Sequence, residues 1–422
     1  MPHRLAPLRP ALLSFVLAWL GACAQSSDGL PPGAGGDAGM GDADSDVGPG
    51  ADAAASIAAI WGVIEYEDKP FDVGGFTGEP LTRPARGVLL RVLDEAGAVL
   101  GEGRTQLDGT FSIAHALPPE ALIRVQAFAE AGLGDHSVRV TDSGRSRSVH
   151  RIESAPIRVA DAADLRLLAE ADRGVGGAFN VADVAFGAFE RYAAFVDPAA
   201  PTLFVEWEPG LAFPCGSCYS ANVISLGGQL DDTDEYDDVI ILHELAHYFV
   251  EHYSRDTSPG GSHRDRRVEP TLAYGEGVAY FLACLLHGSP LIIDTYLSDT
   301  RVIDIEAMTQ ALMTRADFFD TQTGQLDGAL REEIVAGILW DAFDAADPAE
   351  PFDRVELGLD EQLRLLIEYF GTWPHPDQGA PGIDLADYLY ALECFSGIPP
   401  ADVQALADDR AFPWIAGLGC AL

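Results

Sequence analysis

Hydrophobic and polar residues alternate in short runs between residues 57 and 160, and this spacing predicts β-strands. The runs include AAIWGVIEYE, GVLLRVLDEAG and ALIRVQAFAE, and Gly, Pro or Asp residues separate them. Residues 95–97 and 107–109 have the composition of hairpin turns. We therefore expect an all-β unit over residues 57–160.

The spacing of apolar residues becomes mixed after residue 160. Residues 181–196 form an amphipathic helical pattern, and residues 202–207 and 222–226 read as strands. Helical spacing returns near the C-terminus, where we expect helices over residues 303–313, 330–344, 357–370 and 383–392. The pattern as a whole predicts an α+β fold.

Two segments in this second part are apolar on all sides and carry very few polar side chains. One is VIILHELAHYFV at residues 239–250, and the other is LAYGEGVAYFLACLL at residues 272–286. A helix without a polar face is buried in the protein core. Histidines and carboxylates are costly in such a place without a partner, so those present here are candidates for function.

The first segment contains the motif HExxH. His243 and His247 are four residues apart, so both imidazoles leave one face of a helix. This spacing suits a zinc ion, which binds neutral histidine nitrogen readily. Glu244 lies beside the first histidine, where it can act as a general base on a water molecule activated by the metal.

A catalytic zinc needs a third protein ligand. The extended motif of the metzincins is absent, because Val250 and Tyr253 occupy its glycine and histidine positions. His252 is on the wrong side of the same helix. Glu276 is the favoured ligand because it is the single acid in the second apolar helix, and His263, in a polar loop, remains an alternative. We expect the glycines beside Glu276 to let this helix pack closely against the first.

HExxH on one helix and a lone glutamate on a second helix resemble the gluzincin metallopeptidases. The resemblance implies a zincin-like domain in which His243, His247 and Glu276 bind zinc and Glu244 is the general base. The chain departs from thermolysin-like members, because Tyr280 replaces their aspartate. It also has no GAMEN-like strand, so the subfamily is unassigned.

Further parts of a gluzincin-type site are expected on the basis of this resemblance. The strand at residues 222–226 is the candidate sheet edge for a peptide substrate. The donor that stabilises the developing negative charge is one of the tyrosines near the two motifs, and the sequence does not choose among Tyr248, Tyr253, Tyr274 and Tyr280. Asp341 and Asp344 either support a zinc-binding histidine or are solvated at a helix end.

The β-region resembles the carboxypeptidase regulatory-like, transthyretin-type β-sandwich. The resemblance is carried by the run RTQLDGTFSI, with Thr105, Asp108, Gly109 and Phe111 at the signature positions. A module of this kind implies a spacer or a positioning unit for a catalytic domain.

The N-terminus has the features of an export signal. Residues 1–22 contain two arginines followed by a short apolar run, and the sequence LGAC that ends at Cys23 resembles a bacterial lipobox. This implies cleavage before Cys23, lipid on that cysteine, and anchoring to a bacterial membrane, with outer-membrane sorting. Residues 23–56 are rich in Gly, Ala and Asp, and we expect them to be a disordered tether.

The net charge of −40 argues against binding to nucleic acid. An exported protein is exposed to an oxidising environment, so we expect disulfides between Cys215 and Cys218 and between Cys394 and Cys420. Cys284, within the second apolar helix, would then stay reduced.

These observations predict four parts: a lipoprotein signal peptide (residues 1–22), a tether (23–56), a β-sandwich (57–160) and a zincin-like metallopeptidase domain (161–422). The expected function is zinc-dependent hydrolysis of peptide bonds by an exported, lipid-anchored monomer. Two alternatives stay open. One is a surface binding or adhesion protein built on an inactive zincin fold, and the other is a zinc hydrolase that does not act on peptides.

Overall fold

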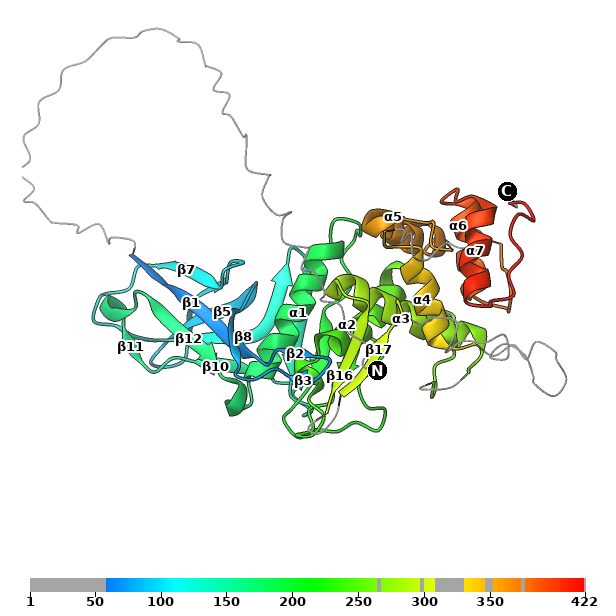
Figure 1. Ribbon diagram of the computed structural model, residues 1–422. Helices are drawn as coiled ribbons and strands as arrows, with labels where there is room; N and C mark the ends of the chain where they lie inside the picture. The colour runs from blue at the N-terminus through cyan, green and yellow to red at the C-terminus, as the bar shows by residue number, and fades with distance from the viewer. Residues whose placement is uncertain are drawn as a thin grey trace, which may run out of the picture. The chain divides into compact units, whose positions relative to one another are not determined.

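The computed structural model describes residues 58–263, 267–296, 300–307, 330–345, 352–372 and 376–420 (Figure 1). The signal and the tether expected from the sequence lie outside these residues. Strands dominate the first part of the described chain and helices the last, so the general α+β class is confirmed. Within the described ranges, no helix combines the length and the apolar character that crossing a membrane requires.

One sheet is built around the long strand β1. Strand β12 pairs with β1 in parallel, whereas β4 and β7 pair with it in antiparallel orientation. Alternate residues of β1, such as Ile60 and Ile64, are fully buried, as expected for a strand with one face on the core. The strands of this sheet are β1 (Ala58–Asp68), β4 (Leu81–Pro84), β7 (Thr110–His115) and β12 (Leu165–Ala169).

The larger sheet has nine strands in the order β14-β15-β13-β9-β8-β5-β6, with β10 and β11 also paired to β8. Its strands are β5 (Val88–Asp94), β6 (Val99–Arg104), β8 (Leu122–Leu133), β9 (His136–Thr141), β10 (Arg151–Glu153), β11 (Ile157–Arg158), β13 (Leu203–Glu206), β14 (Cys218–Ser220) and β15 (Val223–Ser225). Two short hairpins accompany the sheets: β2 (Phe71–Asp72) with β3 (Gly75–Phe76), and β16 (Leu291–Thr295) with β17 (Thr300–Asp304).

The nine-stranded sheet crosses the boundary that the sequence predicts between residues 160 and 161. Strand β13 pairs in parallel with β9, so that Leu203 lies opposite Val138 and Val205 opposite Val140. All four of these apolar side chains are buried. The β-region and the metal-motif region are thus joined through one continuous sheet and one hydrophobic core.

The helices begin with α1, which packs against strands β8, β9 and β1 and against helix α2 (Figure 1). Because α1 is covered from both sides, most of its residues are buried, including Phe179, Phe186 and Phe189. Helix α2 packs on α3, and α3 packs on α4. The α-helices are α1 (Gly176–Tyr192), α2 (Asp238–Tyr253), α3 (Pro270–His287), α4 (Glu332–Asp341), α5 (Gly358–Arg364), α6 (Leu385–Cys394) and α7 (Pro400–Asp409), and a π-helical turn at Leu365–Phe370 extends α5.

Three of the four helices expected near the C-terminus are confirmed, as α4, as α5 with its π-helical turn, and as α6. The helix expected over residues 303–313 is wrong at its start, because Ile303 belongs to strand β17 and pairs with Ile292 of β16. Residues 308–313 lie outside the described chain. A short group of apolar residues fits both helical and strand spacing. Here the pairing with strand β16 makes the segment a strand.

Cysteine pairing follows the expectation from the sequence. Cys215 is bonded to Cys218 just before strand β14, and Cys394 at the end of α6 is bonded to Cys420. Cys284 is a free thiol buried within α3.

Candidate metal centre

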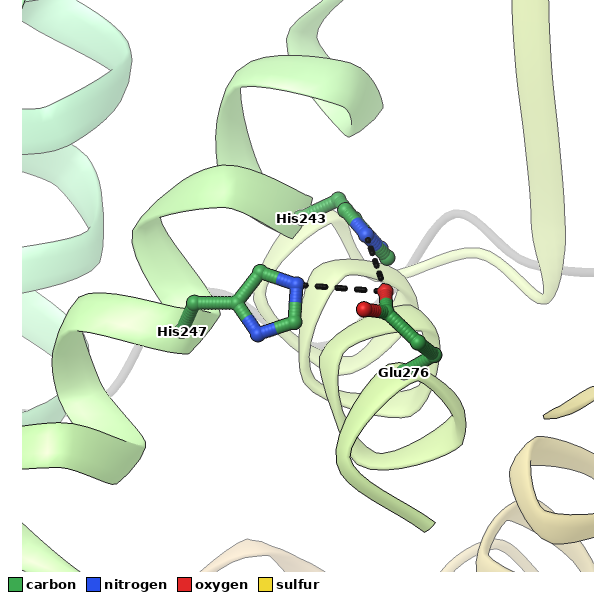
Figure 2. A group of neighbouring side chains, drawn as sticks. All are labelled: His243, His247 and Glu276. Carbon is green, nitrogen blue, oxygen red and sulfur yellow. Dashed lines mark ion pairs between the residues drawn. The ribbon is translucent and has the colours of Figure 1, made fainter. Parts of the chain in front are cut away.

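Helix α2 carries both motif histidines through the protein core. Its apolar residues Val239, Ile241 and Leu245 are essentially inaccessible to solvent, which fixes the rotation of the helix about its axis. With that rotation fixed, His243 and His247 lie one turn apart and both point away from α1 towards α3 (Figure 2). The apolar residues around the motif thus position the two histidines.

Helix α3 carries Glu276 on its second turn. The helix begins at Pro270, whose missing N–H costs nothing at that position, and the Glu269 carboxylate accepts a hydrogen bond from the backbone N–H of Leu272. It ends at His287 and is followed by Gly288, which adopts φ of 82°. Starting and ending signals in the sequence therefore set the register that turns Glu276 towards the histidines.

Glu276 lies beside both imidazoles. The Nε2 atoms of His243 and His247 are each 3.3 Å from Oε2 of Glu276 (Figure 2). Ligand atoms from all three residues lie within 4.8 Å of one another. The structure thus brings together the three residues proposed as ligands from the sequence.

These distances fit a shared zinc ion better than a set of hydrogen bonds. Bonds of about 2.0–2.1 Å to a tetrahedral zinc would place two ligand atoms about 3.3–3.4 Å apart. Oε2 of Glu276 is buried yet has no partner in hydrogen-bond geometry among the described residues. Two imidazole nitrogens and one carboxylate oxygen are the donor set of many catalytic zinc sites, so the residues present fit the metal.

The carboxylate and the two imidazoles strongly influence each other's charge. Burial raises the pKa of Glu276, but its interactions with His243 and His247 outweigh burial and hold the pKa well below the ordinary value. Burial opposes a charge on His247, yet the Glu276 carboxylate raises the pKa of this histidine to about 9. The Glu276 carboxylate therefore keeps its negative charge in a largely buried place, where a cation can balance it.

His263 also approaches the centre, from the loop between α2 and α3. Its Nε2 lies 3.5 Å from Oε2 of Glu276, and its Nδ1 lies 2.6 Å from Oε2 of Glu332 at the start of α4. Burial lowers the pKa of His263, but the bond to the almost fully buried Glu332 raises it above the ordinary value. The sequence kept His263 as an alternative ligand, and the role of Glu332 was missed because 69 residues separate the pair.

Glu244 faces an open cavity next to the three clustered residues. The cavity has a volume of about 810 Å³, and its walls include Tyr219, Glu251, Arg255 and Tyr280. Glu244 is only 6% exposed, and the cavity gives it access to a substrate-sized space. A general base needs this combination of a protected position and access to the reacting atoms.

Of the four tyrosines near the motifs, Tyr280 lies at the centre. Its ring is 4.4 Å from that of His243, and it lines the cavity. Tyr248 donates a hydrogen bond to the backbone oxygen of Pro201, and the Tyr253 hydroxyl accepts one from the backbone N–H of Ala200. Tyr274 is buried and does not line the cavity.

The strand expected at the sheet edge is an inner strand, and the neighbouring strand β14 lies at the edge of the described sheet instead. Strand β15, at Val223–Ser225, lies between β13 and β14 and is an inner strand. Strand β14, at Cys218–Ser220, is the end strand on this side of the described sheet, and Cys218 and Tyr219 line the cavity. The sequence missed it because a three-residue strand has too few positions for a pattern.

Two further expectations are corrected. Asp341 does not support a zinc-binding histidine and is not solvated, because its carboxylate accepts hydrogen bonds from Arg410 and both side chains are 1% exposed. The atoms nearest to a Cβ added at Gly277 belong to Val335 and Glu332 of α4, so this glycine allows close packing on α4 rather than on α2 as expected. His252 lies outside the cluster, with Nε2 2.5 Å from the side-chain oxygen of Asn222.

Comparisons with known proteins add little to this description. No protein-family model matches the chain, and no curated protein does. Among solved structures, a 9R-lipoxygenase from Cyanothece PCC8801 shares 12% identity over 38% of this chain and 27% of the lipoxygenase, with a TM-score of 0.16. A likeness this weak carries no argument about fold or function, so the argument rests on the residues of the chain itself.

Proposed function

We propose that the protein is a zinc-dependent peptidase with a gluzincin-type centre. His243, His247 and Glu276 bind zinc, and Glu244 is the general base. The observation that carries the proposal is the convergence of two imidazoles and one buried carboxylate from two helices, beside a cavity that Glu244 also lines. The resemblance of HExxH and a separate glutamate to gluzincins supports the same assignment.

Each residue then has a defined task. Zinc, when bound, polarises the scissile carbonyl and lowers the pKa of a water molecule. Glu244 removes a proton from the attacking water as the new carbon–oxygen bond forms, and it returns this proton to the amine nitrogen as the carbon–nitrogen bond breaks. Tyr280 is the tyrosine best placed to donate a hydrogen bond to the developing oxyanion, because it lines the cavity beside His243.

The outer strand β14 supports a peptide as substrate. A strand at the end of a sheet offers unpaired backbone groups to an extended chain. Strand β14 is one end of the described nine-stranded order, and its residues Cys218 and Tyr219 line the same cavity as Glu244. The Cys215–Cys218 disulfide closes a small loop immediately before this strand and restricts its motion.

Glu244→Gln tests this function directly. The amide keeps the shape of the side chain but cannot accept the proton, so peptidase activity should fall about 100- to 10,000-fold while zinc stays bound. Glu251→Gln is the matched control, because Glu251 lines the same cavity and lies outside the cluster. Equal activity of the Glu244→Gln variant and the parent on peptides would refute the assigned base.

A closed, non-catalytic metal site is the second candidate, and His263 is the observation that favours it. Zinc sites with four protein ligands are structural, and Nε2 of His263, 3.5 Å from Oε2 of Glu276, is the candidate fourth donor. His263→Ala separates the two candidates. An open catalytic site keeps its zinc in this variant, whereas a closed site loses much of its affinity.

We also propose that the protein is exported and lipid-anchored through Cys23, on the basis of the apolar signal and the LGAC sequence. These residues lie outside the described chain. Labelling of the protein by radioactive palmitate in a bacterial host should be lost in Cys23→Ala, and labelling that persists in the variant would contradict the anchor.

A further inference from the structure

A second cluster of possible metal ligands lies outside the candidate zinc centre and shares no residue with it. It consists of Asp232, Asp234 and Asp294, whose carboxylate oxygens lie within 4.8 Å of one another. Asp232 and Asp234 precede helix α2, and Asp294 belongs to strand β16, which follows helix α3. The cluster thus joins the segment before one helix of the zinc centre to the strand after the other.

The surrounding contacts hold these side chains in place. Asp232 forms an isolated β-bridge with Tyr296, and the Tyr296 hydroxyl donates a hydrogen bond of 2.9 Å to Oδ2 of Asp294. The hydroxyl of Ser217 donates to Oδ2 of Asp234. The carboxylates are therefore oriented by three separate segments of the chain.

One carboxylate oxygen of this cluster, Oδ1 of Asp294, is buried without a hydrogen-bond partner among the described residues. Asp294 as a whole is 8% exposed. Within the same part of the chain, neither Asp234 nor Asp294 forms an ion pair. Burying a carboxylate oxygen in this way is costly unless a cation or a donor binds it.

The electrostatics of Asp234 show the same cost. Burial, together with the neighbouring acids Asp232, Asp294 and Glu235, raises the pKa of Asp234 to about 8. The three carboxylates repel one another in a protein that is already strongly acidic. A divalent cation would remove this repulsion.

The donor set identifies the class of cation. All three side chains offer oxygen, and none offers nitrogen or sulfur, so the cluster favours a hard ion over zinc. Two oxygens on opposite sides of a calcium ion are about 4.6–5.2 Å apart. The carboxylate oxygens of the three aspartates lie within 4.8 Å of one another, so one calcium ion can contact all three. We propose that Asp232, Asp234 and Asp294 bind a calcium ion, with backbone oxygens and water completing its coordination.

Calcium at this place would stabilise the frame of the zinc centre. Asp237, the residue before α2, accepts hydrogen bonds of 2.8 Å from both the backbone N–H and the hydroxyl of Thr295. The calcium site lies beside this existing connection and adds a second tie between the start of α2 and strand β16. The proposal does not depend on peptidase activity, because it concerns a separate set of ligands.

Thermal unfolding of the purified protein with added calcium chloride tests the proposal. Ionic strength is held constant with choline chloride, and contaminating metal is first removed with a chelating resin. Calcium should raise the unfolding temperature of the parent by several degrees. Terbium, a luminescent substitute for calcium, should bind the parent, gain emission from the nearby Tyr296 and be displaced by calcium.

Asp294→Asn and Asp234→Asn are the test variants, and Asp231→Asn, at an exposed neighbouring position, is the matched control. Both test variants should fold without calcium, because the amide relieves charge repulsion, but they should lose the calcium-dependent rise and the terbium signal. The control should keep both. A parent that does not respond to calcium, or an Asp294→Asn variant that responds fully, would overturn the proposal.

Discussion

The close packing of α3 against α4 predicts a large effect of adding one methyl group at Gly277. A Cβ at this position would lie 2.4 Å from Cβ of Val335 and 2.6 Å from the backbone oxygen of Glu332. Ordinary contacts begin near 3.4 Å, so the two helices would have to separate by about 1 Å. Overpacking of this kind costs about 1–3 kcal/mol of unfolding free energy. Glu276 is the adjacent residue, so zinc affinity should fall as well.

Gly275→Ala is the matched control for Gly277→Ala. A Cβ at Gly275 would lie 3.2 Å from side-chain atoms of Asp256 and Ser258, which belong to a loop and can move. Both substitutions gain about 1 kcal/mol in helix propensity, so the difference between the variants isolates the clash. Urea unfolding should show Gly277→Ala to be less stable than Gly275→Ala by about 1–3 kcal/mol. Equal stability of the two would refute the packing argument.

Two further predictions concern buried charge. Asp341→Ala leaves the Arg410 guanidinium buried without its carboxylate partner, and urea unfolding should show a loss of about 3–5 kcal/mol; a loss below 1 kcal/mol would contradict this. The pKa of Asp234 is raised from 3.8 to about 8 in the folded state, so its contribution to stability is complete below about pH 4 and is lost as pH rises towards 8. Without divalent metal, stability should therefore fall over this range, and Asp234→Asn should reduce the slope; an unchanged slope would show that Asp234 does not titrate there.

The sequence predicted those parts of the site whose signals are local. The HExxH spacing and the apolar residues around it specify helix α2, and the apolar run around Glu276 specifies α3. Both disulfides were also predicted, because cysteine pairs of this kind are expected to be oxidised if the chain is exported, as the sequence predicts. In each case neighbouring residues in the chain carry the information.

The parts that the sequence missed depend on contacts between distant segments. Strand β14 is the outer strand only because β15 pairs with β13 on its other side. His263 and Glu332 meet because α4 packs on α3. The residues next to each of them in the sequence contain no pattern that predicts this contact. The continuous sheet across residue 160 likewise depends on the pairing of β13 with β9, which no local pattern encodes.

The most direct test of the proposed centre is the zinc content of the purified parent, measured beside Glu276→Gln and Glu251→Gln. Both substitutions replace a carboxylate by an amide at the same cavity, and Glu276 alone belongs to the ligand cluster. We expect one zinc ion per chain in the parent and in Glu251→Gln, with most of it lost in Glu276→Gln. Full retention of zinc by Glu276→Gln, or a parent that binds none when zinc is added, would contradict the three-ligand centre.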